Sequence, residues 1–489
     1  MSKSKAPLAL PLVLTALAGC TMIPRYFQPE APVPGRFPGG SAQSGNAADL
    51  AWREFFKDPR LKRCIEIALE NNRDLRVAVL NVEQARAQYR ISRSSLFPRI
   101  DATGSYTRAR TPGDTSKPGA PTTTVTTVDP TTTALTSATT STSSSGFTSN
   151  QFSVSVGTTA WELDLFGRVR SLNRQALETY FSRDETRRAT QISLVAQVAT
   201  QYLTLREQEE QLALARQTLM AVQKSYDLNK KQFDIGTASE LDFSTADAQV
   251  QTARINVITF ERLTAQAGNY LALLIGQPLP TDLPPGRALR AQGVIADIPS
   301  GLPSDLIARR PDILAAEHTL LAANANIGAA RAAFFPVISL TTSAGNTSVE
   351  LSRLFSKPAQ MWSFSPQISI PIFTGGSNLA NLDVAKINKR IEIANYEKSI
   401  QTGFREVADA LAGRATYDRS LNAQEALVAA QQRRYDLTDQ RYRGGADSYL
   451  SVLLAQQDLY SAQRDLVSTR TDRLANLITL YKSLGGGLR

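Results

Sequence analysis

Apolar and polar residues change their spacing twice along this chain, in the same way each time. A helical pattern runs up to a Phe-Pro pair at residues 97–98 and again at residues 335–336, and alternation with a period of two follows both. Such alternation predicts strands. The alternating segments are residues 99–106, 152–156, 338–344 and 364–372. A long helical pattern follows each pair, so each half predicts the order helix, strand, strand, very long helix, turn, long helix.

Equal spacings indicate that the two halves repeat one architecture. From Gly236 to Gly276 is 40 residues, and from Gly445 to Gly485 is 40 again. A repeat of this kind has to be recognised before a fold is assigned. The predicted divisions are a signal peptide at 1–19, an extended segment at 20–57, repeat one at 58–280, a linker with a short equatorial segment at 281–310, and repeat two at 311–489.

The predicted strands carry one apolar and one polar face. In the fourth, Phe364, Ile368, Ile370 and Ile372 alternate with serines and a glutamine. This pattern is typical of strands between lipid and water. Four strands cannot close a barrel, and open edges are not tolerated in lipid. Several copies must therefore share one barrel, and strand counting alone does not choose between two and three.

The long helices carry a heptad pattern. No Gly or Pro occurs between Gly167 and Gly236, a stretch of roughly 100 Å as a helix. Apolar residues recur every seven positions, which indicates helices packed side by side into a wall or cylinder. The series are Val198, Leu205, Leu212, Leu219, Tyr226 and Phe233 in one half and Leu421, Val428, Tyr435 and Tyr442 in the other.

The first twenty residues predict export and lipid attachment. A basic start and a short apolar stretch lead to Leu-Ala-Gly before Cys20, which looks like a bacterial lipobox with lipid added to Cys20. Thr21, where an Asp would signal inner-membrane retention, favours the outer membrane. With Cys20 lipidated, the mature chain keeps a single free thiol, that of Cys64, which is predicted to be buried on a helix.

Composition narrows the function. The net charge is +10, but the basic residues are scattered among acidic ones and form no dense block, which argues against nucleic-acid binding. His318 is the only histidine, so no catalytic residues, metal site or cofactor other than the lipid on Cys20 are predicted. We therefore expect no enzyme. Residues 107–150, rich in Thr and Ser, predict a surface loop or strand extensions.

Several motifs closely resemble the lipidated, drug-efflux branch of the TolC-like outer-membrane factors, and together they cover essentially the mature chain. They are GLPSDLIARRPD at 301–312, NIGAARAAFFP at 326–336, WELDLFG at 161–167, IPIFTGG at 370–376, GTASELD at 236–242 and YRGGAD at 442–447.

The resemblance implies a mixed α and β membrane protein with an internal two-fold repeat. Four antiparallel strands per chain would join a shared 12-stranded barrel of a homotrimer in the outer membrane, continuous with a long periplasmic α-helical barrel. A periplasmic adaptor and an inner-membrane pump would be the partners. The function implied is a passive exit duct for small molecules such as antibiotics.

The resemblance also places a periplasmic gate at the two helix–helix turns. Gate positions are Tyr442, Asp447, Leu450, Leu454 and Asp242. Helix-turn tip and adaptor contacts are Gly236, Thr237, Ser239, Glu240, Gly444 and Gly445. Leu454 stands where relatives often have Asp, which favours an apolar ring. Tyr442 could instead simply fill its heptad position, and Asp242 could serve helix capping, a role for which Ser239 competes.

Other functions remain open from the sequence. Within the channel class, the cargo could be metal ions or, by type I secretion, proteins. A different class is a structural, non-conducting trimeric lipoprotein with a helical stalk. Conductance in a planar bilayer separates a duct from a stalk.

Overall fold

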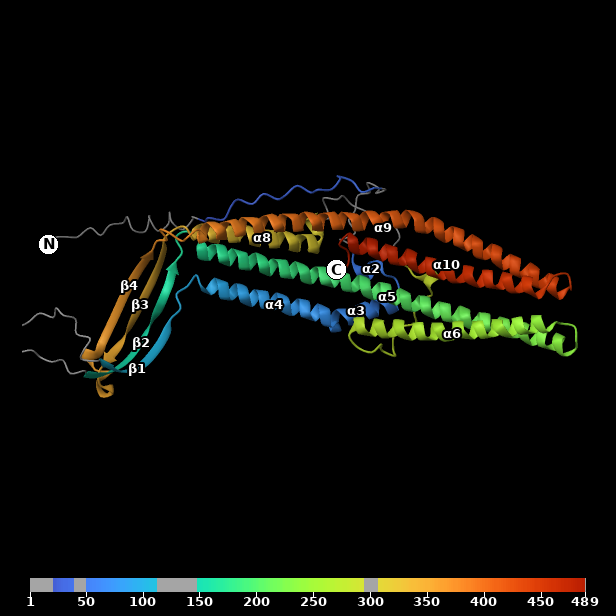
Figure 1. The fold of residues 1–489 in the computed structure, drawn as a ribbon, viewed down its shortest axis with the longest axis horizontal. Helices are drawn as coiled ribbons and strands as arrows, with labels where there is room; N and C mark the ends of the chain where they lie inside the picture. Colours follow the sequence, from blue (N-terminus) through green and yellow to red (C-terminus); the bar gives the residue numbers. More distant parts are fainter. Residues whose placement is uncertain (1–20, 39–49, 112–146, 294–306, 489) are drawn as a thin grey trace, which may run out of the picture. The chain divides into compact units, whose positions relative to one another are not determined.

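The computed structural model describes residues 21–38, 50–111, 147–293 and 307–488, in two compact units (Figure 1). The first unit holds the strands and the helix ends next to them, in residues 90–173 and 327–382. The second unit holds most helical residues. Cys20 lies outside the described residues.

Within the described residues, the first unit contains a four-stranded antiparallel sheet in the order β1-β2-β3-β4. The strands are β1 (Asp101–Thr111), β2 (Phe147–Leu163), β3 (Val337–Ser348) and β4 (Gln360–Ser369). Each strand pairs with its neighbour in sequence, so β1 and β4 form the two edges. Short 3₁₀ turns η4 (Leu351–Arg353) and η5 (Lys357–Ala359) join β3 to β4.

The predicted alternation is present in the sheet. Hydroxyl groups meet across one face, where Ser105 Oγ lies 2.7 Å from Ser153 Oγ and Ser343 Oγ lies 2.8 Å from Ser363 Oγ. The other face carries large exposed apolar side chains, including Phe364 and Ile368. β4 ends at Ser369, so Ile370 and Ile372, which the alternation had assigned to the fourth strand, lie beyond it. Residues 371–374, which include Pro371, lead into the next helix without strand pairing.

The first hairpin is longer than the second. Residues 147–151 of β2 pair only with β1, because the pairing of β2 with β3 starts at Phe152. The predicted strand extensions are therefore present in residues 107–111 and 147–151, and residues 112–146 lie outside the described part. The register of β2 against β3 shifts between Thr158 and Trp161, where Ala160 has a positive φ of 51°.

The predicted order of helices occurs twice along the chain. The first series is α4 (Arg73–Ser94), α5 (Arg168–Asp234) and α6 (Glu240–Ile275), and the second is α8 (Pro311–Ala332), α9 (Ser377–Arg443) and α10 (Tyr449–Ser483). α5 and α9 both have 67 residues, and α6 and α10 have 36 and 35. Short elements are α2 (Trp52–Phe55), α3 (Pro59–Asn71) and η3 (Leu289–Ala291).

The helical pattern that runs up to Phe97 predicts one continuous helix, but the chain breaks at Asn72 between α3 and α4. The backbone of Asn72 is extended, with φ −62° and ψ 131°. Its side chain accepts a hydrogen bond from Leu75 N at 2.9 Å and donates one to Leu274 O at 2.8 Å. Asn72 thus caps α4 and holds the break against the end of α6.

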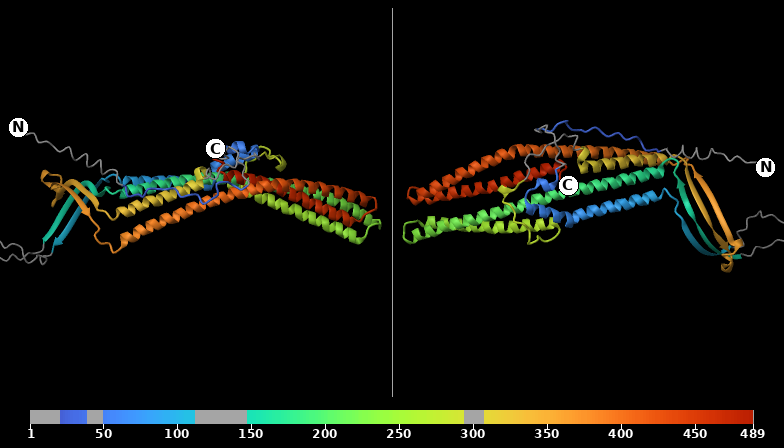
Figure 2. Two further views of the ribbon diagram at one scale, coloured as in Figure 1. Left: turned by 90° about the horizontal axis from the view of Figure 1, so that it is seen from above. Right: turned by 180° about the vertical axis from the view of Figure 1, so that it is seen from behind.

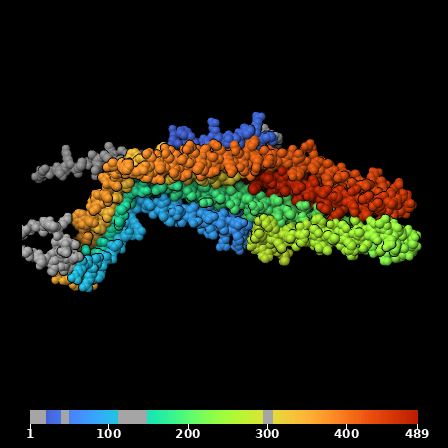
Figure 3. Space-filling model, in the orientation of Figure 1, coloured from blue at the N-terminus to red at the C-terminus, as the bar shows by residue number. Residues whose placement is uncertain are grey.

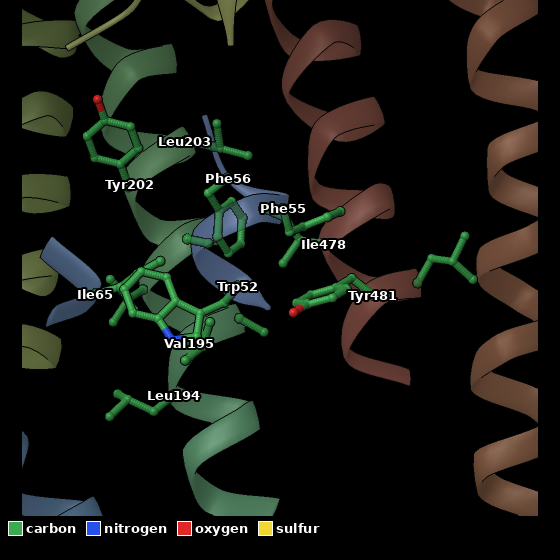
Figure 4. Close-up of a cluster of buried hydrophobic side chains, with 14 of the residues drawn as sticks. Trp52, Phe55, Phe56, Ile65, Leu194, Val195, Tyr202, Leu203, Ile478 and Tyr481 are labelled. Carbon is green, nitrogen blue, oxygen red and sulfur yellow. The ribbon is translucent and has the colours of Figure 1, made fainter. Parts of the chain in front are cut away.

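The core of the second unit includes a group of aromatic side chains where α2 meets α5 and α10. Figure 4 shows Trp52, Phe55 and Phe56 between side chains of α5 and of α10. The rings of Phe55 and Tyr481 stack with centroids 4.1 Å apart. Cys64 is fully buried in the same cluster, as the sequence predicted.

The assignment of residues 58–280, 281–310 and 311–489 to two repeats and a linker stays a prediction.

In the part of the chain that the structure describes, no helix combines the length and the apolar character needed to cross a membrane.

Candidate functional site

Two helix–helix turns lie at the same end of the second unit, one between α5 and α6 and one between α9 and α10 (Figures 1 and 2). Both are built in the same way. Gly236 and Gly445 have φ of 78° and 74°, a conformation that favours glycine. The next residue in each turn, Thr237 or Ala446, donates its N–H across 2.8 Å to a carbonyl five residues back. This pattern is a Schellman cap, so these two glycines are needed for the turn itself.

Serine caps the helix that leaves each turn. Ser239 Oγ accepts from Asp242 N at 3.1 Å, and Ser448 Oγ accepts from Ser451 N at 3.4 Å. Ser239 Oγ also donates to the Asp242 carboxylate at 2.8 Å. The N-cap is thus Ser239, and Asp242 completes a capping pair from the first turn. Its carboxylate also acts electrostatically on Tyr442 and Tyr449.

Tyr442 joins the two helix pairs. Its hydroxyl lies 3.2 Å from Asn229 Oδ1 and 3.0 Å from Gln232 Oε1, both on α5. Burial raises the pKa of Tyr442, and the carboxylates of Asp242 and Asp439 add to the rise. The hydroxyl is therefore protonated at neutral pH and available as a donor.

Asp447 is held within its own turn. Its carboxylate lies 3.3 Å from Arg441 Nε and accepts from Ser448 N at 2.9 Å. Hydrogen bonds from Ser451 and from Ser448 N, together with the charge of Arg441, lower the pKa of Asp447. The group is therefore an anion at neutral pH.

Leu450 and Leu454 take no part in these contacts. They lie one helical turn apart on α10 and are 56% and 47% exposed, whereas the neighbouring Val452 and Leu453 are buried. Leu241, in the same position of the α5–α6 turn, is 74% exposed. The end of each hairpin, visible as two adjacent ridges in Figure 3, thus presents an uncovered apolar residue just beyond its turn.

The remaining predicted tip residues have local roles. Thr237 Oγ1 donates to Gln232 O at 3.0 Å, Glu240 opens α6, and Gly444 N donates to Gln440 O at 3.1 Å. The sequence analysis missed three residues that contact Tyr442 or Asp447, namely Asn229, Gln232 and Arg441. A buried tyrosine hydroxyl needs a polar partner. No pattern in the sequence identifies which polar residues of α5 supply it.

His318 lies away from the turns. Its Nδ1 is 2.7 Å from Glu178 Oε2, and Glu178 also pairs with Arg174 at 2.6 Å. Among the described residues, no group of three or more His, Cys, Asp or Glu side chains could hold a metal ion.

The family model described as outer membrane efflux protein matches this chain at residues 64–277 and 302–486. The chain belongs to this family. It is 47% identical over 490 residues to the toluene efflux pump outer membrane protein TtgC and, equally, to the antibiotic efflux pump outer membrane protein ArpC, both of Pseudomonas putida. These matches cover 99% of this chain and 96% of each relative.

A solved structure shares the fold. The MtrE outer membrane channel of Neisseria gonorrhoeae, in its open state, matches with a TM-score of 0.84 and 40% identity, over 96% of this chain and 99% of that one. Together with the four antiparallel strands and the repeated long helices, this match confirms the predicted fold class.

The family assignment also confirms the predicted outer-membrane location and the role of an efflux channel, which is a transport role. Lipid attachment at Cys20 and the gate residues remain predictions.

Proposed function

We propose that this chain is the passive exit duct for small organic molecules in a tripartite efflux pump. Its relatives are named for efflux of toluene and of antibiotics, which supports an organic cargo. The proposed duct moves solutes without catalysing a reaction. An inner-membrane pump supplies the energy, and a periplasmic adaptor contacts the two helix turns.

The duct is a homotrimer in this proposal. β1 and β4 are edge strands of the described sheet, and lipid does not tolerate unpaired strand edges. Pairing β1 of one copy with β4 of the next removes every edge. Three copies give the 12 strands of a closed barrel, above the roughly eight strands at which barrels begin.

Exposed apolar side chains on the helices support contacts between copies. Val384, Ile387 and Ile391 follow one another at helical spacing on α9 and are 55%, 45% and 50% exposed. Val77 and Leu80 on α4 are 55% and 52% exposed. Such stripes are expected to be covered by a neighbouring helix.

The proposed gate lies at the turns. The observation that carries it is the contact of Tyr442 with Asn229 and Gln232, which ties α9 to α5 close to the uncovered Leu450 and Leu454. Three copies of this pair would crowd the axis with apolar side chains. An apolar constriction can stop ions by dewetting.

Replacing Leu450 and Leu454 together by Ser tests the gate. Single-channel conductance in planar bilayers should rise, and cells should become more sensitive to large antibiotics. Leu427, also exposed at 43% but on α9 and far from the turn, provides the matched control as Leu427→Ser. If the double variant forms trimers and conducts like the wild type, these leucines are not the gate.

A further inference from the structure

The apolar face of the sheet carries charge at one end only. By the strand register, this face takes every second residue of each strand. Its large side chains include Tyr106, Phe152, Trp362, Phe364 and Ile368. Among the positions of this face in the described strands, the only charged residues are Arg108 and Arg110.

Both arginines lie at the hairpin end of the sheet. They follow Tyr106 along β1 and pair with Asn150 and Thr148 of β2. The opposite end of these two strands joins α4 and α5. A strand rises about 3.4 Å per residue and tilts by about 40° in a membrane barrel, so Arg108 stands about 5 Å and Arg110 about 10 Å beyond Tyr106 along the membrane normal.

The two guanidinium groups have no counter-charge within the described part of the chain. Arg108 and Arg110 are exposed, and neither forms an ion pair or a hydrogen bond with a described residue. By contrast, Arg99 at the other end of the same strand pairs with Asp101 at 2.8 Å. Two neighbouring cations on one face are therefore available to an anion from outside the chain.

The aromatic residues beside them indicate the depth of the site. Tyr106 stacks on Phe152 with ring centroids 4.7 Å apart, and aromatic side chains of this kind mark the membrane interface in outer-membrane barrels. An arginine in the hydrocarbon layer would be costly, whereas one just beyond the aromatic residues lies level with the lipid headgroups.

The headgroups at this level carry phosphate. The outer leaflet of a bacterial outer membrane consists largely of lipopolysaccharide, whose lipid part bears phosphate groups on its sugars. A guanidinium group binds phosphate through two parallel hydrogen bonds. The apolar residues below the arginines suit the acyl chains of the same lipid.

We propose that Arg108 and Arg110 bind the phosphate groups of lipopolysaccharide on the outside of the barrel. The acyl chains of the bound lipid pack along the apolar face beside Tyr106 and Phe152. The site rests on the outer-membrane barrel of the proposed function, and it is independent of the gate and of the cargo.

The test uses the purified full-length channel, stripped of lipid in detergent, with bisphosphorylated lipid A as the probe. Native mass spectrometry reports the trimer and its bound lipid separately, so a failure of the proposed assembly is distinguished from a failure of the site. Replacing Arg108 and Arg110 together by Gln should weaken the lipid A affinity about 10- to 100-fold, because charge-assisted hydrogen bonds are lost. Arg99→Gln removes an exposed arginine from the other end of the strand and should bind like the wild type.

Two measurements on the wild type need no variant. Lipid A without its phosphates should bind about 10- to 100-fold more weakly than the bisphosphorylated form, because it offers the arginines no anion. Inorganic phosphate at the same concentration as the lipid should not displace it, because free phosphate makes no contact with the apolar face.

Three outcomes would overturn the proposal. The first is equal lipid A affinity in the wild type and the double variant, with both proteins trimeric. The second is equal binding of the phosphorylated and dephosphorylated lipids. The third is displacement of lipid A by an equal concentration of inorganic phosphate, which would identify a site for free anions instead of a lipid.

Discussion

At the scale of single residues, the two turns show how a repeat can diverge. Phe233 and Tyr442 each stand three residues before the glycine of their turn. Phe233 stacks on Phe243 at 5.2 Å within its own hairpin, whereas Tyr442 reaches Asn229 and Gln232 on another helix pair. The hydroxyl group of Tyr442, which Phe233 lacks, thus makes a contact between hairpins in place of a purely local one.

Tyr442→Phe is expected to loosen the proposed gate while keeping the ring packed. A net hydrogen bond is worth about 0.5–1.5 kcal/mol, so the open probability should rise roughly 3- to 10-fold. Bilayer recordings of single channels measure it, with the exposed Tyr270→Phe as the control. If the open probability of Tyr442→Phe equals that of the wild type, the hydroxyl does not hold the proposed gate closed.

At the scale of elements, Asp58 fastens the linker to the helices. Its buried carboxylate caps α3 through Arg60 N at 2.9 Å, and accepts from Tyr202 Oη at 2.7 Å, Gln292 Nε2 at 2.8 Å and Arg287 N at 3.1 Å. Burial alone would raise the pKa of Asp58, but these hydrogen bonds outweigh it and lower the pKa. One side chain therefore joins α3, α5 and the segment before repeat two.

Asp58→Asn should destabilise the protein by about 2–3 kcal/mol at pH 7, because an amide N–H₂ would face donors. Since the folded-state pKa of Asp58 is lowered, its contribution is complete above the unfolded pKa near 4 and is lost as pH falls through the folded value. The gap in denaturant midpoint between wild type and variant should therefore narrow below about pH 4. The control is Asp282→Asn, an exposed residue of the same linker, which should change stability by less than about 0.5 kcal/mol.

At the scale of the whole molecule, assembly follows from what one chain leaves uncovered. The sheet has two open edges, and α9 carries an exposed apolar stripe. Both features are parts of the surface that further copies of the same chain would cover.

The protein in detergent is expected to behave as a trimer of about 150 kDa, three times the mature chain. Ile391→Asp puts a charge on the exposed stripe of α9 and should shift the population toward monomer in light scattering. Asn381→Asp adds the same charge at an exposed polar position of that helix and should leave the trimer intact. A monomeric wild type with a complete sheet would contradict the assembly.

Much of this fold could be predicted from the sequence, because period and spacing encode it. Alternation gave the four strands, and the absence of Gly and Pro gave the span of α5. The break at Asn72 was hidden because it depends on a hydrogen bond to Leu274, about 200 residues away. Hydrogen bonds between distant segments leave no periodic pattern in the sequence. Tyr442 was therefore predictable as a tip residue, but its partners Asn229 and Gln232 were not.

The unequal hairpins have a consequence for the cell surface. β2 has 17 residues, whereas ~9–11 suffice to cross a bilayer, and residues 147–151 rise above β3 with support from β1 alone. In the proposed trimer, the longer β1–β2 hairpins and the shorter β3–β4 hairpins would alternate around the outer opening of the barrel. The three gaps between them would give solutes leaving the duct a sideways route into the surroundings, even where a large molecule covers the top.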